Sequence, residues 1–316
     1  MDVVSRFLLW MEAERRYSPL TLRNYRRDIE EFARWRGVTC ATLDFENIAR
    51  KDIQDWLYYL SDRRKLKAST VNRMLASLRT LWRWMLAHGH VSKDIMHGVR
   101  QYKTPRALPI FVPDTRMRDV VEELRSDLAS EDIWRVRDAL IILLIYTSGM
   151  RLAELVALND EDIAADCRSV VVMGKGRKER VLPLLASLGK IIKKYFRLKY
   201  SQNICIAEKK ALILSKKGVR INCRAVQRIV DQKLKGVGVA GRTSPHVLRH
   251  TFATQLLNEG ADLREIQELL GHSDLRATQI YTHLDIAKLR DAYHKAHPRE
   301  RDDEDSGGTR DDSAHI

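Results

Sequence analysis

Cysteines and long apolar runs are scarce in this chain of 316 residues, and acidic side chains are too few to balance the basic ones. Asp and Glu number 42 against 56 Lys and Arg, so the formal charge at pH 7 is +14. This excess of cations favours a polyanionic partner over a small neutral substrate, because cations that bind phosphates release condensed counterions. Charge therefore points to nucleic acid, although it decides nothing about catalysis.

The four cysteines are scattered along the chain and form no paired spacing; they are Cys40, Cys167, Cys205 and Cys223. Zinc sites are typically signalled by closely spaced pairs of cysteine or histidine residues. We therefore expect reduced structural thiols, no bound metal and no cofactor.

Apolar stretches are also short, since none approaches the roughly 20 residues that a helix needs to span a bilayer. The chain begins with a charged amphipathic helix and not with a signal peptide. We expect a cytoplasmic protein with no membrane partner. A chain of this length with 44% hydrophobic residues can bury two modest cores, so two domains are expected.

The first hundred residues lack the period-two alternation of strands and repeat apolar residues at helical spacing. Ser18 followed by Pro19 is typical of a helix start, and this helix should run to about Arg36. A second helix is expected around residues 53–60, and a third from near residue 69 to residue 89. The pattern predicts an all-helical N-terminal domain.

Three prolines interrupt the helical pattern between residues 101 and 113, so we place the domain boundary near Pro105. Residues 1–105 carry 20 basic and 12 acidic side chains. A solvated surface explains any single cation equally well, but their density favours a helix face that crosses a DNA backbone. The candidates for these phosphate contacts are Lys67, Arg73, Arg79 and Arg83.

The pattern of apolar residues between positions 106 and 298 predicts an α+β domain with a small β-sheet. The apolar run from Ala139 to Tyr146 indicates a buried helix that ends at Gly149. Helical periodicity returns at residues 185–200 and 224–235, and continues almost unbroken from residue 245 to residue 294. The last 18 residues, 299–316, hold seven acidic and three basic side chains and should form a disordered tail.

One β-hairpin is expected between residues 169 and 184, where SVVVM and RVLPL flank a highly basic turn. This turn contains Lys175, Arg177 and Lys178. A basic turn at the tip of a hairpin can reach into a DNA groove, so we include Arg177 and Lys178 among the candidate DNA contacts and keep Lys175 as a catalytic candidate.

Two further helices carry candidate site residues, and the start of the first suits an anion. Arg151 follows Gly149 at the beginning of a helix, where free backbone amides also favour negative charge, and Glu154 is placed to hold its guanidinium. His246 and Arg249 lie three residues apart and therefore on one side of another helix, whose apolar residues, including Leu257, should face the core. Each arginine alone would be read as an ordinary surface residue.

Further along, Gly271 should close one helix, with His272 at the junction and Tyr281 two turns along the next. A tyrosine on a helix is usually a packing residue, and only the assembled set changes that interpretation. A phosphodiester attacked by a phenol needs donors on both non-bridging oxygens, a base for the phenolic proton and an acid for the departing 5′ oxygen. This chain can supply every role.

The assignment of these roles follows from residue chemistry. Arg151 and Arg249 would clamp the phosphate, and His272 would add a third donor. His246 would help Tyr281 to lose its proton, and Lys175 would protonate the leaving oxygen. No metal ion is needed for this chemistry.

The same segments resemble the tyrosine recombinases, also called the phage integrase family, and within that family the Xer group. The resemblance covers nearly the whole chain, because STVNRMLASLRTLWRWM is also similar to the family's core-binding domain. All six catalytic positions are matched in order. They lie in GMRLAELVAL with Arg151 and Glu154, GKGRKERVLPL with Lys175, SPHVLRHTFAT with His246 and Arg249, LLGHSDL with His272, and TQIYTH with Tyr281.

The resemblance implies a mainly α-helical protein whose N-terminal SAM-like core-binding domain and catalytic domain clamp duplex DNA. Four subunits, of one or two kinds, would assemble on DNA sites with two half-sites each. Each tyrosine would form a 3′-phosphotyrosyl bond, and strand exchange would pass through a Holliday junction. The helix after the nucleophile, residues 285–297, would dock into a neighbouring protomer.

The Xer-like features further imply resolution of chromosome or plasmid dimers, hence a role in chromosome partition at cell division, with a second Xer-type recombinase and a DNA translocase as partners. Three alternatives stay open: an integrase or transposase of a mobile element, a type IB topoisomerase, and a DNA-binding accessory protein that does not cut. The last of these predicts the loss of a catalytic side chain, and none is lost.

Overall fold

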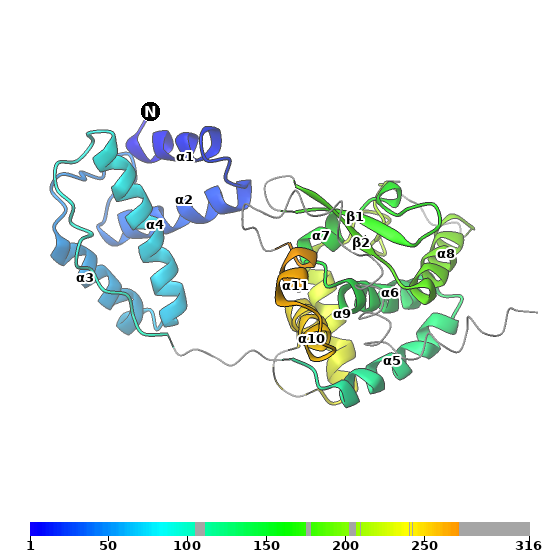
Figure 1. The fold of residues 1–316 in the computed structure, drawn as a ribbon. Coiled ribbons are helices and arrows are strands. Elements are labelled where there is room, and N and C mark those ends of the chain that lie inside the picture. Colours follow the sequence, from blue (N-terminus) through cyan, green and yellow to red (C-terminus); the bar gives the residue numbers. More distant parts are fainter. Residues whose placement is uncertain are drawn as a thin grey trace, which may run out of the picture. The chain divides into compact units, whose positions relative to one another are not determined.

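The computed structural model describes residues 1–104, 111–174, 178–201, 207–208, 210–239, 241 and 243–271. The chain divides into two compact units, Met1–Ala107 and Leu108–Ile316, and each has its own hydrophobic core. Helices dominate both units, and a two-stranded sheet lies in the second (Figure 1). The expectation of a mainly helical protein with a small sheet is confirmed.

Within residues 1–104 the chain forms four α-helices and one π-helical turn, α1 Val3–Ala13, α2 Pro19–Trp35, α3 Arg50–Tyr58, η1 Tyr59–Arg63 and α4 Ala68–Ala87. The predicted start of α2 is confirmed, since the Ser18 hydroxyl accepts from the Thr21 amide at 3.3 Å and Pro19 is the first helical residue. The chain leaves α4 through Gly89, whose φ of +68° places it in the left-handed region.

The core of the first unit is rich in aromatic side chains. Trp56 of α3 and Trp82 of α4 are almost fully buried. Phe32 meets Trp56 edge-on at a centroid distance of 5.2 Å, and Phe45 meets Trp82 in the same way at 5.9 Å. This geometry is favourable because the positive edge of one ring faces the negative face of the other. The apolar positions that predicted these helices are therefore the ones that form the core.

The described part of the second unit contains seven α-helices, a 3-10 turn and one hairpin. The helices are α5 Asp114–Ala129, α6 Ile133–Ser148, α7 Leu152–Ala157, α8 Ala186–Ser201, α9 Cys223–Gly236, α10 Pro245–Asn258 and α11 Leu263–Leu269; the 3-10 turn is η2 Asp160–Asp162. The predicted apolar helix is α6, which is buried along most of its length and packs against α5, α8 and α10 (Figure 1). Its burial explains why its sequence is apolar on all sides.

The hairpin joins β1 Ser169–Met173 to β2 Glu179–Pro183 in antiparallel register, with Val172 opposite Arg180. Side chains alternate between a buried and an exposed face along both strands. The Gly174 amide donates to the Lys178 carbonyl at 2.7 Å and closes the base of the turn. The predicted hairpin is thus confirmed in its strands, whereas residues 175–177 lie outside the described residues.

The expectation of almost unbroken helix after residue 245 is wrong at residues 259–262. There Gly260 adopts a φ of +85° and separates α10 from α11. Leu257, expected in the core, is 50% exposed because it lies in the last turn of α10, just before this break. Leu248 on the same helix is fully buried instead.

Neither a membrane-spanning helix nor a cluster of metal ligands occurs among the described residues. None of the helices described here is long and apolar enough to cross a membrane. No group of three or more potential metal ligands occurs in the same described ranges. Cys40, Cys167 and Cys223 are free thiols there, and Cys205 lies outside the description, as do the expected boundary at Pro105 and the tail 299–316.

Asp127 of α5 is a buried carboxylate between two cations. It accepts from Arg135 Nε at 2.8 Å and from Lys233 Nζ at 2.5 Å. Burial by itself would raise the pKa of Asp127, but the hydrogen bonds from Lys233 and Arg135 outweigh it, so the pKa lies below its ordinary value. A lowered pKa contributes stability above the unfolded-state value of about 4, and that stability is lost as the pH falls through the folded-state pKa.

Asp127→Asn should therefore lower the free energy of unfolding by about 1–2 kcal/mol at pH 7, with a smaller deficit at pH 3. Urea unfolding at the two pH values measures this difference. Asp119→Asn is a matched control on the same helix, because Asp119 and its partner Arg116 are both more than half exposed. An equal deficit for Asp127→Asn at both pH values would contradict the proposed cause.

Candidate active site

The turn between α6 and α7 fixes the first arginine of the site. Gly149 adopts a φ of +64°, and a Cβ on it would lie 2.4 Å from Cδ1 of Phe252, so glycine is required there. α7 begins directly after Arg151, and Arg151 Nη1 donates to Glu154 Oε1 at 2.9 Å. Glu154 therefore does contact the arginine that the sequence placed beside it.

The start of α7 is not the open anion site that the sequence suggested. Glu154 Oε2 accepts from the Arg151 backbone amide at 2.7 Å, so a carboxylate of the chain itself caps the helix. The helix is also only six residues long. An anion at this turn would therefore have to meet the guanidinium of Arg151, whose side chain is 35% exposed.

Arg249 is the buried arginine of α10. Its Nη1 donates to the Gly149 carbonyl and its Nη2 to the Leu270 carbonyl, both at 2.6 Å. One planar guanidinium thus joins the end of α6 to the end of α11. This contact places Arg249 beside the turn that carries Arg151, although the two are 98 positions apart in sequence.

A third arginine comes from strand β2. Arg180 is buried, and its Nη1 and Nη2 donate to the two oxygens of Glu154 at 2.8 Å and 2.7 Å. This is the two-pronged pairing that suits a planar guanidinium and a carboxylate. Arg180 Nε also donates to the Leu269 carbonyl at 3.1 Å.

The three arginines meet at the C-terminal end of α11. The consecutive carbonyls of Leu269, Leu270 and Gly271 accept from Arg180, Arg249 and Arg151, the last at 2.7 Å. Such carbonyls have no partner within their helix and carry partial negative charge, so cations stabilise them. The chain therefore reaches residue 272 from a point held by three guanidinium groups.

Among the described residues that meet at the end of α11, three arginines stand against one carboxylate, that of Glu154. Burial, followed by repulsion from Arg151, lowers the pKa of Arg249 to about 10, which leaves it protonated at neutral pH. Burial would raise the pKa of Glu154, but hydrogen bonds from Arg180 and the Arg151 amide outweigh it and lower that pKa, so Glu154 stays ionised. The net positive site suits an oxyanion such as a DNA phosphate.

Of the six catalytic candidates, the structure brings Arg151 and Arg249 together. His246 lies one turn before Arg249 on α10 and is exposed. Lys175, His272 and Tyr281 lie outside the described residues. The roles of all six stay predictions.

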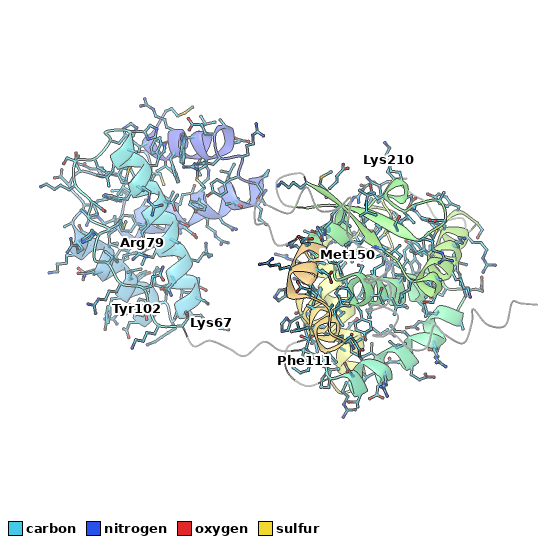
Figure 2. All side chains as sticks on the ribbon, viewed as in Figure 1. Lys67, Arg79, Tyr102, Phe111, Met150 and Lys210 are labelled. Atoms are coloured by element: carbon cyan, nitrogen blue, oxygen red, sulfur yellow. The ribbon has the colours of Figure 1, made fainter. Side chains whose placement is uncertain are left out.

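The candidate DNA contacts differ in their surroundings. Arg73 pairs with the buried Asp28, and Arg79 donates to the Val99 carbonyl, so groups of the first unit already hold both. Lys67, Arg83 and Lys178 are exposed, and Arg177 lies outside the described residues. Lys67 and Arg79 are labelled in Figure 2. Phosphate binding by this set stays a prediction. Its exposed members in the first unit are Arg83 on α4 and Lys67, the residue directly before that helix.

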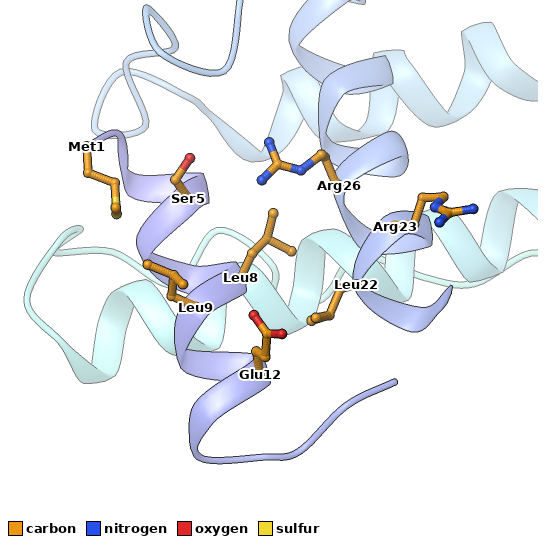
Figure 3. Close-up of a pocket in the computed structure, with 8 residues that line it drawn as sticks. All are labelled: Met1, Ser5, Leu8, Leu9, Glu12, Leu22, Arg23 and Arg26. Carbon is orange, nitrogen blue, oxygen red and sulfur yellow. The ribbon is translucent and has the colours of Figure 1, made fainter. Parts of the chain in front are cut away.

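A groove in the first unit lies apart from this chemistry. It runs between α1 and α2 and is lined by apolar side chains, including Leu8, Leu9 and Leu22, beside Arg23 and Arg26 (Figure 3). A large apolar pocket is often the first place to seek a binding site. Here none of the catalytic candidates that the structure describes, Arg151, His246 and Arg249, is among the lining residues.

Sequence reasoning missed Arg180, although a signal was present. Alternation along RVLPL places Arg180 and Leu182 on the same face of β2, and both are buried. An arginine at an inward position of a strand is rarely buried without a partner. The pattern therefore could have predicted a buried carboxylate opposite the hairpin, but it could not say which one.

The fold is shared with solved structures of DNA-bound recombinases. A solved structure described as the XerH site-specific recombinase bound to a palindromic difH substrate, a post-cleavage complex, superposes with a TM-score of 0.66 at 21% identity, covering 89% of this chain and 81% of that one. A lambda integrase tetramer bound to a Holliday junction superposes with a TM-score of 0.61 at 20% identity, covering 88% and 77%.

Sequence comparison identifies the family. Residues 117–288 match the phage integrase family, and residues 4–89 match the phage integrase N-terminal SAM-like domain. A protein named tyrosine recombinase XerC from Corynebacterium glutamicum is 39% identical over 282 residues, which are 89% of this chain and 87% of the relative. The chain belongs to the phage integrase family. It is a tyrosine recombinase, an enzyme of site-specific recombination that cleaves and rejoins DNA.

Proposed function

We propose that the chain cleaves DNA through Tyr281 and that Arg151 and Arg249 clamp the scissile phosphate. The observation that supports this most directly is the convergence of both arginines on the carbonyls of Leu270 and Gly271. Because the next residue is His272, the phosphate clamp and the segment that carries the nucleophile share one anchor point.

In the proposed step, the phenolic oxygen of Tyr281 attacks the phosphorus atom and the bond from phosphorus to the 5′ oxygen breaks. His246 accepts the phenolic proton, and Lys175 gives a proton to the departing 5′ oxygen. The product is a 3′-phosphotyrosyl bond and a free 5′ hydroxyl. Attack by the 5′ hydroxyl of a partner strand reverses the step, so no energy source is consumed.

The arginines would act chiefly on the transition state. Negative charge on the non-bridging oxygens is greatest when phosphorus is five-coordinate, and fixed cations stabilise that state more than the ground state. Arg151 is exposed enough to meet the phosphate directly, and Arg249 is held beside it by two carbonyls. His272 would complete the set of donors.

The biological role that we favour is resolution of chromosome or plasmid dimers in the cytoplasm, in support of chromosome partition. The XerC name of the relatives supports it. The DNA-bound XerH and the lambda integrase tetramer support assembly of four subunits on double-stranded DNA with two half-sites. A second Xer-type recombinase and a DNA translocase are the further partners we propose.

The N-terminal unit would also bind the DNA site, with Lys67 and Arg83 on phosphates. Both are exposed on α4 or at its start, whereas Arg73 and Arg79 are already bonded within the unit. The helix expected at residues 285–297, proposed to dock into a neighbouring subunit, lies outside the described residues.

A nicked suicide substrate tests the catalytic proposal, because loss of a short 5′ fragment traps the covalent adduct. Mass spectrometry of the adduct should place the DNA on Tyr281, and Tyr281→Phe should form none. Adduct formation by Tyr281→Phe would overturn the assignment of the nucleophile. Exchange between two identical sites, with none between two unlike sites, would favour dimer resolution over integration of a mobile element.

A further inference from the structure

Arg180 occupies the centre of the site but does not belong to the set of six catalytic candidates. Its side chain is only 6% exposed, and all three of its nitrogens donate hydrogen bonds to other groups of the chain. Arg151, whose side chain is 35% exposed, is better placed than Arg180 to meet a DNA phosphate. The contacts that the structure gives Arg180 are all with groups of the chain itself, so its contribution is sought through the residues that it touches.

The geometry points to Arg180 as a positioning residue that neutralises Glu154 and thereby leaves the charge of Arg151 available to the DNA phosphate. This inference rests on the proposed function, in which Arg151 binds that phosphate. It assigns to Arg180 a part in the reaction without any contact to substrate.

Glu154 is bonded more completely by Arg180 than by Arg151. Arg180 takes both carboxylate oxygens in a two-pronged pair, while Arg151 reaches only Oε1 with its Nη1. The other terminal nitrogen of Arg151 turns to the Gly271 carbonyl. Arg180 already pairs with both oxygens of the carboxylate. The Arg151 side chain therefore makes one hydrogen bond to Glu154 and does not form a two-pronged pair with it.

The buried charge of Glu154 needs a cation beside it. The Glu154 side chain is 4% exposed, so its negative charge must be balanced by a neighbouring cation and not by water. Without Arg180, Arg151 would be the remaining guanidinium bonded to Glu154 in the described contacts. The carboxylate would then draw Arg151 inward into a two-pronged pair. The positive charge of Arg151 would neutralise Glu154 and would no longer be available to the phosphate.

The position of Arg180 in the hairpin also brings it close to the basic turn. Arg180 lies opposite Val172 in the strand pair, and its Nη1 would be 3.5 Å from a Cβ built on Gly174, the residue before Lys175. Its Nε holds the Leu269 carbonyl, three residues before His272. One buried side chain therefore lies beside the base of the basic turn and bonds both to Glu154 and to the chain that leads to His272.

The test uses the full chain on a nicked suicide substrate, with the single-turnover rate of adduct formation and the DNA dissociation constant measured separately. Arg180→Met should cleave about 100-fold more slowly than wild type, since small displacements of a catalytic group cost that much, while the dissociation constant changes less than about threefold. Arg180→Lys should be intermediate, because an ammonium supplies the charge but not the fork.

A double-variant cycle separates this role from a structural one. If Arg180 acts by neutralising Glu154, it has nothing to neutralise once the carboxylate is replaced by an amide. Glu154→Gln combined with Arg180→Met should therefore cleave within about threefold of Glu154→Gln alone, and about tenfold faster than Arg180→Met. A merely structural Arg180 predicts that the double variant is the slowest of the three.

Arg137→Met is the matched control, because Arg137 is a buried arginine of the same unit that pairs with Asp138 and the Leu214 carbonyl, at the opposite end of α6 from Gly149. It should lose stability but keep its cleavage rate at temperatures where it is folded. If Arg180→Met does not fold, the comparison of the double variant with Glu154→Gln decides alone.

Two results would overturn the inference: cleavage by folded Arg180→Met within about twofold of wild type, or a double variant far slower than Glu154→Gln. Failure of the proposed function looks different. In that case wild type itself would form no adduct that depends on Tyr281, whatever residue stands at position 180.

Discussion

Arg249→Lys should slow the first strand cleavage by about 100- to 1000-fold, the loss expected when a fixed donor to a charged transition state is removed. Arg249 holds two carbonyls in different directions, Gly149 from the end of α6 and Leu270 from the end of α11, each at 2.6 Å. A lysine has one nitrogen on a flexible stem and cannot present the same planar array of donors. The phosphate clamp would lose its shape even though the charge is kept.

The measurement is the single-turnover rate of covalent adduct formation on a suicide substrate, at DNA concentrations well above the dissociation constant. Arg137→Lys makes the same chemical change at another buried arginine of the second unit and should leave the rate near that of wild type. A loss smaller than about fivefold for Arg249→Lys would show that Arg249 holds the helices together but does not take part in the reaction.

Gly149→Ala should have the largest effect on stability, lowering the free energy of unfolding of the second unit by about 2–5 kcal/mol. Two costs combine. A φ of +64° is unfavourable for any residue with a Cβ, and that Cβ would lie 2.4 Å from Phe252 Cδ1 and 2.9 Å from Leu270 Cδ2. Phe252 is nearly fully buried and has no room to withdraw.

Hydrogen–deuterium exchange of peptides from α6 and α10 measures this change within the full chain, since it reports each unit separately. Gly238→Ala is the control, because Gly238 has a φ of +74° but no atom within 4 Å of the added Cβ. It should cost only the backbone term, about 1–2 kcal/mol. Equal losses for the two variants would mean that the predicted clash with Phe252 and Leu270 is relieved by movement of the core.

Local pattern was enough to predict most of the elements. The Ser18–Pro19 start of α2, the apolar run of α6 ended by Gly149, and the two strands around the basic turn all appear where the sequence placed them. These features are short-range: a cap, a helical period or a period of two is decided by neighbours a few residues away. The break at Gly260 was missed because apolar spacing continues across it.

The sequence alone also determined the family and its candidate catalytic residues, since ordered motifs carry that information without coordinates. The sequence could not determine which arginines bond to the carboxylate of Glu154. Arg180, Arg249 and Arg151 come from a strand, a helix and a turn far apart in the chain, and they meet on three successive carbonyls only after α6, α10 and α11 have packed together. Side-chain partners across such distances depend on tertiary packing, so only the folded structure could show that Arg180, and not Arg151, is the principal counterion of Glu154.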